Sequence, residues 1–353
     1  MHHAATCLFA AFPPVAASVA AGRIPGAVLG VRDAEGRMAI RAIGHAQRET
    51  GPSQPEPIAM RDATCFDLAS LTKVIFTTTA ILKLVEAGRI GLDDTLASAI
   101  PDLRQYDVAN APERRLTFRQ CLSHQTHLPA VAPLYTYGQN PQTLRAFVLQ
   151  REWTAGPPVY SDINFILLGI AIERLTGRAL AEQPLPSGFT WRPDPAACAA
   201  TEFCQWRGRV MRGEVHDENA YALGGASGHA GLFGPAAAVL DFAGDLLARR
   251  VLGAASLAAL RKPHTPQRAL GWEVAHPGWS GGDGCSPQTI GHTGFTGTGL
   301  WIDWERNLSW TLLTNRVHPT RHAETGIAAL RRDVGERLGS AQTRQWAEAP
   351  WIP

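Results

Sequence analysis

Lysine is the scarcest of the charged residues in this chain. Among 353 residues there are 33 basic ones, of which only Lys73, Lys83 and Lys262 are lysines and all the others are arginines. Arginine keeps its proton in a protein, whereas lysine can lose its proton and act as a base. Each lysine is therefore a candidate wherever a reaction needs an amine base.

An excess of charge of one sign is also missing. The 33 basic and 31 acidic residues leave a formal net charge of +2, and only 18% of the residues are charged. This balance creates no extended electrostatic field that would attract nucleic acid or an anionic lipid surface. We therefore expect a small-molecule or peptide–sugar substrate and no nucleic-acid partner; the sequence does not define the oligomeric state.

The sequence lacks a typical export signal and a long hydrophobic run. The apolar patch at residues 7–12 is short, and histidines rather than lysines or arginines precede it. A signal peptide needs a basic segment followed by a longer apolar one, and a membrane-spanning helix needs about 20 apolar residues. We expect no membrane span and a cytoplasmic location, or a periplasmic one if the start site hides a signal peptide.

Cysteine is sparse, and no Cys-x-x-Cys pair occurs. Six cysteines are scattered along the chain, unlike the dense pattern of a small disulfide scaffold. We interpret them as reduced, partly buried thiols. The sequence predicts neither a cofactor nor a metal.

The residue patterns that the sequence does contain predict an α+β fold. Strands are expected near both ends of the chain, at 25–31, 37–44, 289–294, 299–304 and 308–315. Helices are expected at 15–21, 70–87, 163–175, 235–249 and 324–338, and an irregular surface excursion at 184–204. This order predicts one antiparallel sheet built from N- and C-terminal strands, with flanking helices and an inserted all-helical subdomain. We expect a single catalytic domain, 1–353, with a sheet part at 1–68 plus 265–353 and a mainly helical part at 69–264.

The first candidate catalytic element is Ser70-Leu71-Thr72-Lys73, at the start of a predicted helix. Residues three apart share one helix face, so the Ser70 hydroxyl and the Lys73 amine can meet there. Serine is a weak nucleophile without an adjacent base, and a desolvated lysine has a lowered pKa and can serve as that base. By itself the spacing is also what a capped helix with a solvated lysine would show.

Two further elements complete the expected site. Tyr160 precedes Ser161 and Asp162 at a second helix start, where Tyr160 could shuttle protons and Asp162 could bind substrate or cap the helix. His292, Thr293 and Gly294 end a strand that is followed by Phe295. We expect the amides of Ser70 and Phe295 to form an oxyanion hole, and His292 to supply a donor or a pH-dependent positive charge.

These three motifs in this order resemble the active-site signature of class C β-lactamases, D,D-peptidases and related esterases. The resemblance implies the β-lactamase and penicillin-binding-protein fold and a serine hydrolase working through an acyl-enzyme. Two positions depart from it. His292 replaces the lysine of Lys-Thr-Gly, and Asp162 replaces the asparagine of Tyr-x-Asn. Both changes argue against an efficient β-lactamase.

A second resemblance is to the branch that contains N-acetylmuramyl-L-alanine amidases. It is carried by residues 213–220, which include His216 and Asn219, and by a glycine-rich segment around His229. It implies that these residues bind a muropeptide-type substrate. A metal site formed by His216, Asp217, Glu218 and His229 is a competing interpretation, but their spacing matches no zinc motif.

The sequence thus predicts a serine hydrolase that cleaves an amide or ester, possibly in muropeptides. The alternatives are a carboxylesterase, a weak β-lactamase or D,D-peptidase using the same residues, and a non-catalytic binder of peptidoglycan fragments. Trp206 and Trp272 could stack on a sugar, although core packing is the more common role of tryptophan.

Overall fold

A seven-stranded antiparallel sheet organises the computed structural model, which describes residues 2–48 and 56–348. The strand order is β3-β2-β1-β11-β10-β9-β8, so the two ends of the chain meet where β1 pairs with β11. The strands are β1 Gly26–Arg32, β2 Met38–Gln47, β3 Ile58–Ala59, β8 Glu273–Val274, β9 Thr289–Thr293, β10 Gly299–Asp303 and β11 Leu308–Thr314. The expected sheet of N- and C-terminal strands is confirmed. Edge strands β3 and β8 are too short to have been predicted.

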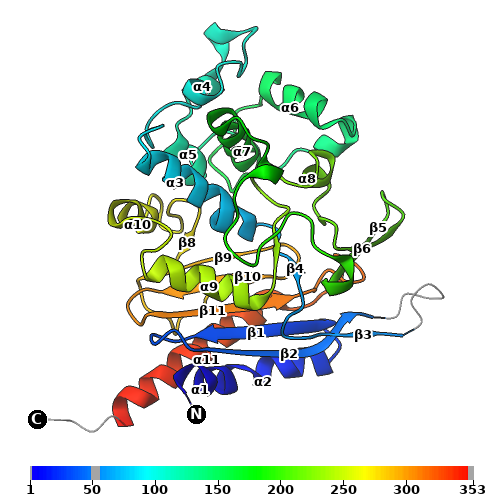
Figure 1. Ribbon diagram of the computed structural model, residues 1–353, viewed down its shortest axis with the longest axis vertical. Coiled ribbons are helices and arrows are strands. Elements are labelled where there is room, and N and C mark those ends of the chain that lie inside the picture. The colour runs from blue at the N-terminus through cyan, green and yellow to red at the C-terminus, as the bar shows by residue number, and fades with distance from the viewer. Residues whose placement is uncertain (1, 49–55, 349–353) are drawn as a thin grey trace, which may run out of the picture.

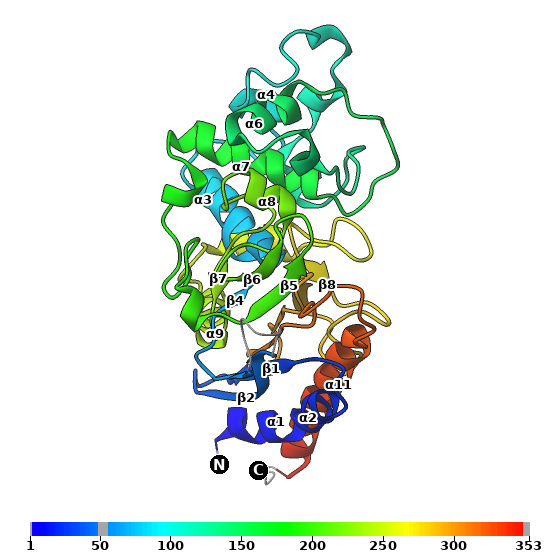
Figure 2. The same cartoon turned by 90° about the vertical axis from the view of Figure 1, so that its right-hand side faces the viewer.

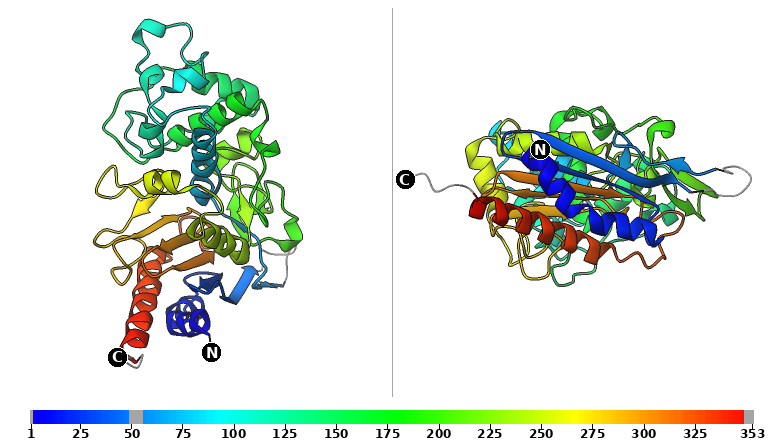
Figure 3. Two further views of the ribbon diagram at one scale, coloured as in Figure 1. Left: turned by 60° about the vertical axis from the view of Figure 1, so that its left-hand side comes forward. Right: turned by 90° about the horizontal axis from the view of Figure 1, so that it is seen from below.

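Both faces of the sheet are covered, because side chains alternate between two apolar cores. On β1, Leu29 and Val31 point into the core shared with the terminal helices, whereas Val28 belongs to the larger core on the other face. The terminal helices are α1 His3–Ala11, α2 Pro13–Ala20 and α11 Ile327–Glu348. They lie across one face (Figure 3), while α9 Ala236–Leu247 packs on the other.

The helical part lies above the sheet on the α9 side (Figures 1 and 2). Its helices are α3 Thr79–Glu86, α4 Leu96–Ala99, α5 Phe118–Leu122, α6 Pro141–Gln150, α7 Asp162–Thr176, α8 Glu218–Ala222 and α10 Ala254–Arg261. This part is not purely helical. A ribbon of β5 Ala200–Cys204 and β6 Arg209–Arg212 projects from it, and β7 Phe233–Gly234 pairs with β4 Phe66–Asp67.

The N-terminal helices correct the expectation that the chain has no long hydrophobic run. The 18-residue stretch from His3 to Ala20 is, by length and composition alone, apolar enough to cross a membrane. In the structure the stretch is divided at Phe12, which is followed by two prolines. Ala4, Cys7, Leu8 and Val15 from it are buried in the core beneath the sheet. The sequence expectation missed this stretch because it counted only the apolar run 7–12, which is followed by Pro13 and Pro14.

Candidate active site

Ser70 follows a short, tightly held segment. Asp67 on β4 is buried and accepts hydrogen bonds from the amides of Ala69 (2.9 Å) and His216 (2.6 Å). Ala69 has a φ of 47°, in the left-handed region that non-glycine residues adopt only under strong constraint. The helix starts at Leu71, one residue later than expected, and residues Lys73–Thr78 form a π-helical turn before α3. Such turns are frequent at functional sites.

The Lys73 ammonium lies against the Ser70 hydroxyl. Its Nζ is 2.9 Å from Ser70 Oγ, 3.1 Å from the His229 carbonyl oxygen and 2.8 Å from Asp162 Oδ1. The first two contacts are hydrogen bonds and the third is an ion pair, an arrangement that suits a protonated lysine. Burial alone lowers the pKa of Lys73, but the Asp162 carboxylate and the Tyr160 hydroxyl raise it by more, so the pKa is above its ordinary value.

This geometry corrects the expectation of a neutral amine. The sequence shows a lysine next to a serine, but not the carboxylate that lies beside both. Asp162 is the first residue of α7, and it is Ser161, not Asp162, that caps this helix by accepting a hydrogen bond from the Asn164 amide. Asp162 is thereby free to pair with Lys73.

Tyr160 is packed between charged and aromatic groups. Its ring centroid lies 5.1 Å from Lys73 Nζ, 5.1 Å from the Arg268 guanidinium carbon and 4.5 Å from the His124 ring. The His124 Nδ1 atom accepts a hydrogen bond of 3.0 Å from the Ser161 amide, which fixes the chain that carries Tyr160. His124 was not among the expected site residues, because a lone histidine after a helix has no distinctive pattern.

The end of β9 approaches Ser70 from the sheet. Gly294 leads into a turn closed by hydrogen bonds of its own amide to the Thr298 carbonyl and of the Gly297 amide to the Gly294 carbonyl. A Cβ atom on Gly294 would lie 2.6 Å from the Leu68 carbonyl oxygen and 2.1 Å from Thr298 Oγ1. Glycine therefore allows this turn to pack against the segment that leads to Ser70. Phe295 follows with its side chain 49% exposed.

The expected site residues surround one cleft of about 730 Å³. It is lined by Ser70, Tyr160, Asp162, His216, Asn219, His292, Thr293, Gly294 and Phe295. Lys73 and His229 are buried behind this surface. Four arginines that the sequence did not single out as a group also line it: Arg268, Arg316, Arg321 and Arg331.

Comparison with known proteins identifies the family. The family model described as Beta-lactamase matches residues 15–333. This chain belongs to the Beta-lactamase family. An N-acetylmuramyl-L-alanine amidase of Bacillus subtilis (strain 168) is 32% identical to it, over 85% of this chain and 79% of the relative.

Solved structures share the fold. EstCE1, described as a hydrolase with promiscuous acyltransferase activity, superposes with a TM-score of 0.70 at 20% identity, over 94% of this chain and 99% of that one. A class C β-lactamase from Rhodobacter sphaeroides gives a TM-score of 0.69 at 19% identity, over 95% and 99% of the two chains. The expected β-lactamase-like fold and the resemblance to a hydrolase family are thus confirmed.

Within the Beta-lactamase family fold, His292 does not carry the charge that the sequence suggested. It is buried, its Nδ1 lies 2.9 Å from the Thr293 carbonyl, and its Nε2 has no hydrogen-bond partner among the described residues. Burial, followed by the positive charges of Arg268 and Lys73, lowers its pKa well below the usual value. His292 is therefore neutral at physiological pH and cannot replace a lysine ammonium.

The segments resembling the amidase branch divide into lining and supporting residues. Asn219 holds the residue 132–135 loop, since its Nδ2 donates to the Ala132 carbonyl and its Oδ1 accepts from the Tyr135 amide. The His229 ring is buried between Ser227 and Asp217, with both contacts at 2.9 Å. Burial raises the pKa of Asp217, but His229 lowers it by more, to a value far below normal. Asn219 and His216 both line the cleft, whereas the His229 ring is buried behind it.

The possible metal ligands that lie together in the structure differ from the set expected from the sequence. Within the described parts of the chain, possible ligand atoms of Asp162, Asp217 and His229 lie within 4.8 Å of one another. His216 is not among them, because its Nε2 lies 2.9 Å from Glu202 Oε2. Lys73 already neutralises Asp162, and Asp217 pairs with His229. These contacts engage Oδ1 of each aspartate and Nε2 of His229.

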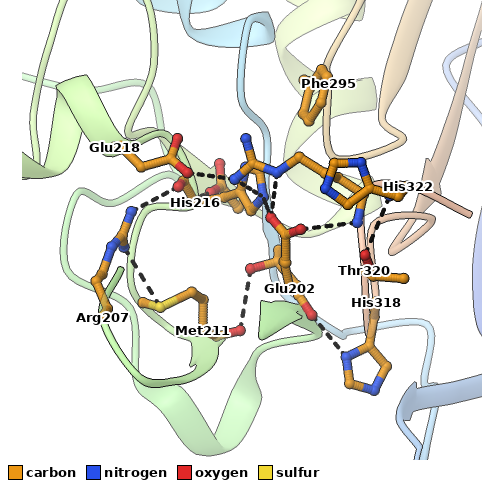
Figure 4. Close-up of polar contacts among 12 residues, drawn as sticks. Glu202, Arg207, Met211, His216, Glu218, Phe295, His318, Thr320 and His322 are labelled. Atoms are coloured by element: carbon orange, nitrogen blue, oxygen red, sulfur yellow. Dashed lines mark hydrogen bonds and ion pairs between the residues drawn. The ribbon is translucent and has the colours of Figure 1, made fainter. Parts of the chain in front are cut away.

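A polar network supports the wall of the cleft beside Phe295. Figure 4 shows Glu202 of β5 between His216 and Glu218 on one side and Thr320 and His318 on the other. Arg321 bonds to both Glu202 and Glu218, and its guanidinium carbon lies 5.7 Å from the Phe295 ring. Glu202 was missed because its segment was predicted to be an irregular excursion.

The two tryptophans have different environments. Trp272 is completely buried in the main core, as expected for a packing residue. Trp206 is 38% exposed and its ring centroid lies 4.9 Å from Tyr135, which lines the cleft.

Proposed function

We propose that this protein is a serine amidase that hydrolyses an N-acylated amino acid or peptide of the muropeptide type through an acyl-enzyme on Ser70. The observation that carries the proposal is the 2.9 Å contact between Lys73 Nζ and Ser70 Oγ at the wall of a cleft that also exposes Tyr160. The choice of an amide is supported by the relative named N-acetylmuramyl-L-alanine amidase.

In the proposed mechanism, Lys73 remains an ammonium ion throughout. Ser70 Oγ attacks the acyl carbonyl carbon, and its proton passes to the ionised Tyr160 oxygen, whose charge Lys73 stabilises. The amides of Ser70 and Phe295 hold the oxyanion. Tyr160 then returns the proton to the leaving nitrogen as the C–N bond breaks. Water enters by the reverse proton path and hydrolyses the ester on Ser70.

The test compares wild-type and Ser70→Ala protein on N-acetylmuramyl-L-alanine and on a short acyl ester. Intact-protein mass spectrometry follows exposure to a fluorophosphonate and to penicillin. We expect a fluorophosphonate adduct on Ser70, release of L-alanine by wild type, and no turnover by the variant. Efficient turnover of the ester alone would replace the amidase with a carboxylesterase. A penicillin adduct that is hydrolysed rapidly would favour a lactamase, and a stable one a D,D-peptidase. Absence of both adduct and turnover would leave only a binding protein.

A further inference from the structure

Two cysteines that are far apart in the sequence face each other beside the segment that leads to Ser70. Cys65 lies directly before β4, and Cys198 lies two residues before β5. The Cys65 amide donates to the Ala197 carbonyl, and the Ala199 amide donates to the Cys65 carbonyl, both at 2.9 Å. These hydrogen bonds form a parallel bridge in which Cys65 is paired with Cys198. Paired residues place their side chains on the same face, so the two thiols are neighbours.

The spacing of a directly paired couple suits a disulfide. Hydrogen-bonded strands lie about 4.8 Å apart, and a disulfide needs Cα atoms roughly 4.4–6.8 Å apart with the Cβ atoms not pointing away from each other. Both cysteines belong to one small buried cluster, together with Val215, Ala230 and Phe233. A covalent bond between the two sulfur atoms therefore needs little movement of either main chain.

Neighbouring contacts hold both segments in this arrangement. Two residues after Cys65, the Asp67 carboxylate accepts a hydrogen bond of 2.6 Å from the His216 amide. The Cys198 carbonyl accepts a hydrogen bond of 2.8 Å from Arg212 Nε, which lies on β6. The pairing of the two cysteines is thus fixed by the chain around them as well as by the bridge.

The two thiols differ in acidity. The side-chain hydrogen bond with Cys198 is the largest influence on Cys65 and lowers its pKa, although burial and the charge of Asp67 oppose this effect. The pKa of Cys198 is raised, first by the hydrogen bond with Cys65 and then by burial. Because the thiolate is the reactive form of cysteine, an oxidant should attack Cys65 first, and Cys198 is then the resolving thiol.

The pair lies directly beneath the surface. Cys65 is 9% exposed and follows residues 61–63, which are exposed, and Cys198 is buried just after the exposed residues 194–197. The susceptibility of a thiol to oxidation follows its thiolate character and its exposure. A small oxidant such as hydrogen peroxide therefore suits this site better than a bulky one such as glutathione disulfide.

The other cysteines lack this combination of features. Within residues 2–48 and 56–348, no second pair of cysteines is matched across a bridge or between strands; Cys204, at the end of β5, is opposite Arg209. Burial, and after it the charge of Asp33, raises the pKa of Cys7 to about 11. Burial alone raises the pKa of Cys121.

We propose that Cys65 and Cys198 form a redox modification site, at which hydrogen peroxide converts the two thiols into a disulfide. In the first step the Cys65 sulfur attacks one peroxide oxygen, the O–O bond breaks, and one water leaves as Cys65 becomes a sulfenic acid. In the second step the Cys198 sulfur attacks the Cys65 sulfur, the S–O bond breaks, and the hydroxyl leaves with the Cys198 proton as a second water. The two thiols are oxidised by two electrons in total, and the peroxide is reduced.

The disulfide would tie the segment before Ser70 to the β5–β6 ribbon, which carries Glu202 in the wall of the cleft. No step of its formation involves Ser70, so this inference does not depend on the proposed function.

The test exposes the folded wild-type protein to hydrogen peroxide, then unfolds it and alkylates the remaining thiols before mass spectrometry. We expect two of the six cysteines to escape alkylation, and the peptides that contain residues 65 and 198 to be joined by a bond that dithiothreitol breaks. Cys198→Ser should stop at a sulfenic acid on Cys65, which dimedone traps, whereas Cys65→Ser should keep all its thiols free. Full alkylation of the treated wild type, or a link through another cysteine, would overturn the proposal.

Cys204→Ser is the matched control, because it removes another buried cysteine of the same ribbon whose partner is an arginine; it should form the same link as wild type. The disulfide also constrains the unfolded chain between residues 65 and 198. We expect it to raise the melting temperature by roughly 5 °C, a gain that dithiothreitol removes and that Cys65→Ser never shows. An unchanged or lower melting temperature of the linked protein would mean that the bond is strained, and would contradict the preformed pairing.

Discussion

At the scale of the residue, the chemistry of the site depends on whether the Lys73 amine is protonated. A serine and a lysine three positions apart are compatible with a neutral amine base or with an ammonium ion. The Asp162 carboxylate at 2.8 Å favours the ammonium ion, because it compensates a positive charge on Lys73, which is completely buried. In the proposed mechanism Tyr160 is then the proton acceptor.

Asp162→Asn tests this assignment. The pKa of Lys73 is above its ordinary 10.5, so the ammonium ion, and the activity that needs it, persist at alkaline pH. Without the carboxylate, burial lowers the pKa with only Tyr160 to oppose it, so the alkaline limb of the pH profile of kcat/KM should move to lower pH. We expect activity at neutral pH to fall about 10- to 100-fold. Asp93→Asn, which removes an exposed ion pair with Arg119, is the control. A higher rate at neutral pH would instead identify a neutral lysine as the base.

Glu202→Gln should change how stability depends on pH. Burial raises the pKa of Glu202, but His216 and Arg321 lower it by more, to about 2 from 4.5. The depressed pKa adds stability that is present above about pH 4.5 and is lost as the pH falls towards 2, by up to about 3 kcal/mol. Urea titrations from pH 6 to 2.5 should show this loss in wild type and a flatter profile in the variant. Parallel profiles would show that the ion pairs with Glu202 contribute nothing.

At the scale of the element, the site depends on two turns that approach each other from opposite ends of the chain. The segment before Ser70 is held by Asp67, and the turn after β9 packs on it through Gly294. Thr296 and Thr298 bond to the carbonyls of Asp67 and Leu68, which couples the two turns directly. The position of the Phe295 amide is therefore set by backbone packing.

Gly294→Ala should damage catalysis more than folding. The new methyl group would lie 2.6 Å from the Leu68 carbonyl, which is backbone and cannot turn away, so the turn must shift. Misplacing one oxyanion donor is expected to lower kcat about 10²- to 10³-fold. Stability should fall by about 1–3 kcal/mol, as in other overpacked sites. Gly156→Ala, where the nearest atom is 3.9 Å away, is the control. A variant with normal kcat would exclude Phe295 from the oxyanion hole.

At the scale of the whole molecule, the sheet is stabilised from both faces, and the N-terminal helices form part of the outer layer. Figure 3 shows them beside α11 across the sheet. Val15 of α2 is completely buried in the same core as Trp301 and Trp310 of the sheet. This packing buries part of the apolar stretch against the sheet.

Val15→Asp distinguishes a packed layer from a detached apolar segment. A buried unpaired carboxylate should lower the free energy of unfolding by at least about 3 kcal/mol, measured by urea denaturation. Ala17→Asp, on the exposed side of the same helix, should have little effect. Equal stability of the two variants would show that α2 does not pack on the sheet in solution.

The sequence by itself determined the fold and named the residues of the candidate site, because both depend on local signals. Alternating apolar residues specify the strands, and three short motifs name Ser70, Lys73, Tyr160 and the turn at Gly294. Only the tertiary structure decided the charge states. Lys73 and His292 are far apart in the sequence from the charged groups that surround them, and burial together with neighbouring charge determines the protonation of each. The spacing of residues contains no information about solvent exclusion, which is why the ammonium form of Lys73 and the neutral His292 could not be predicted.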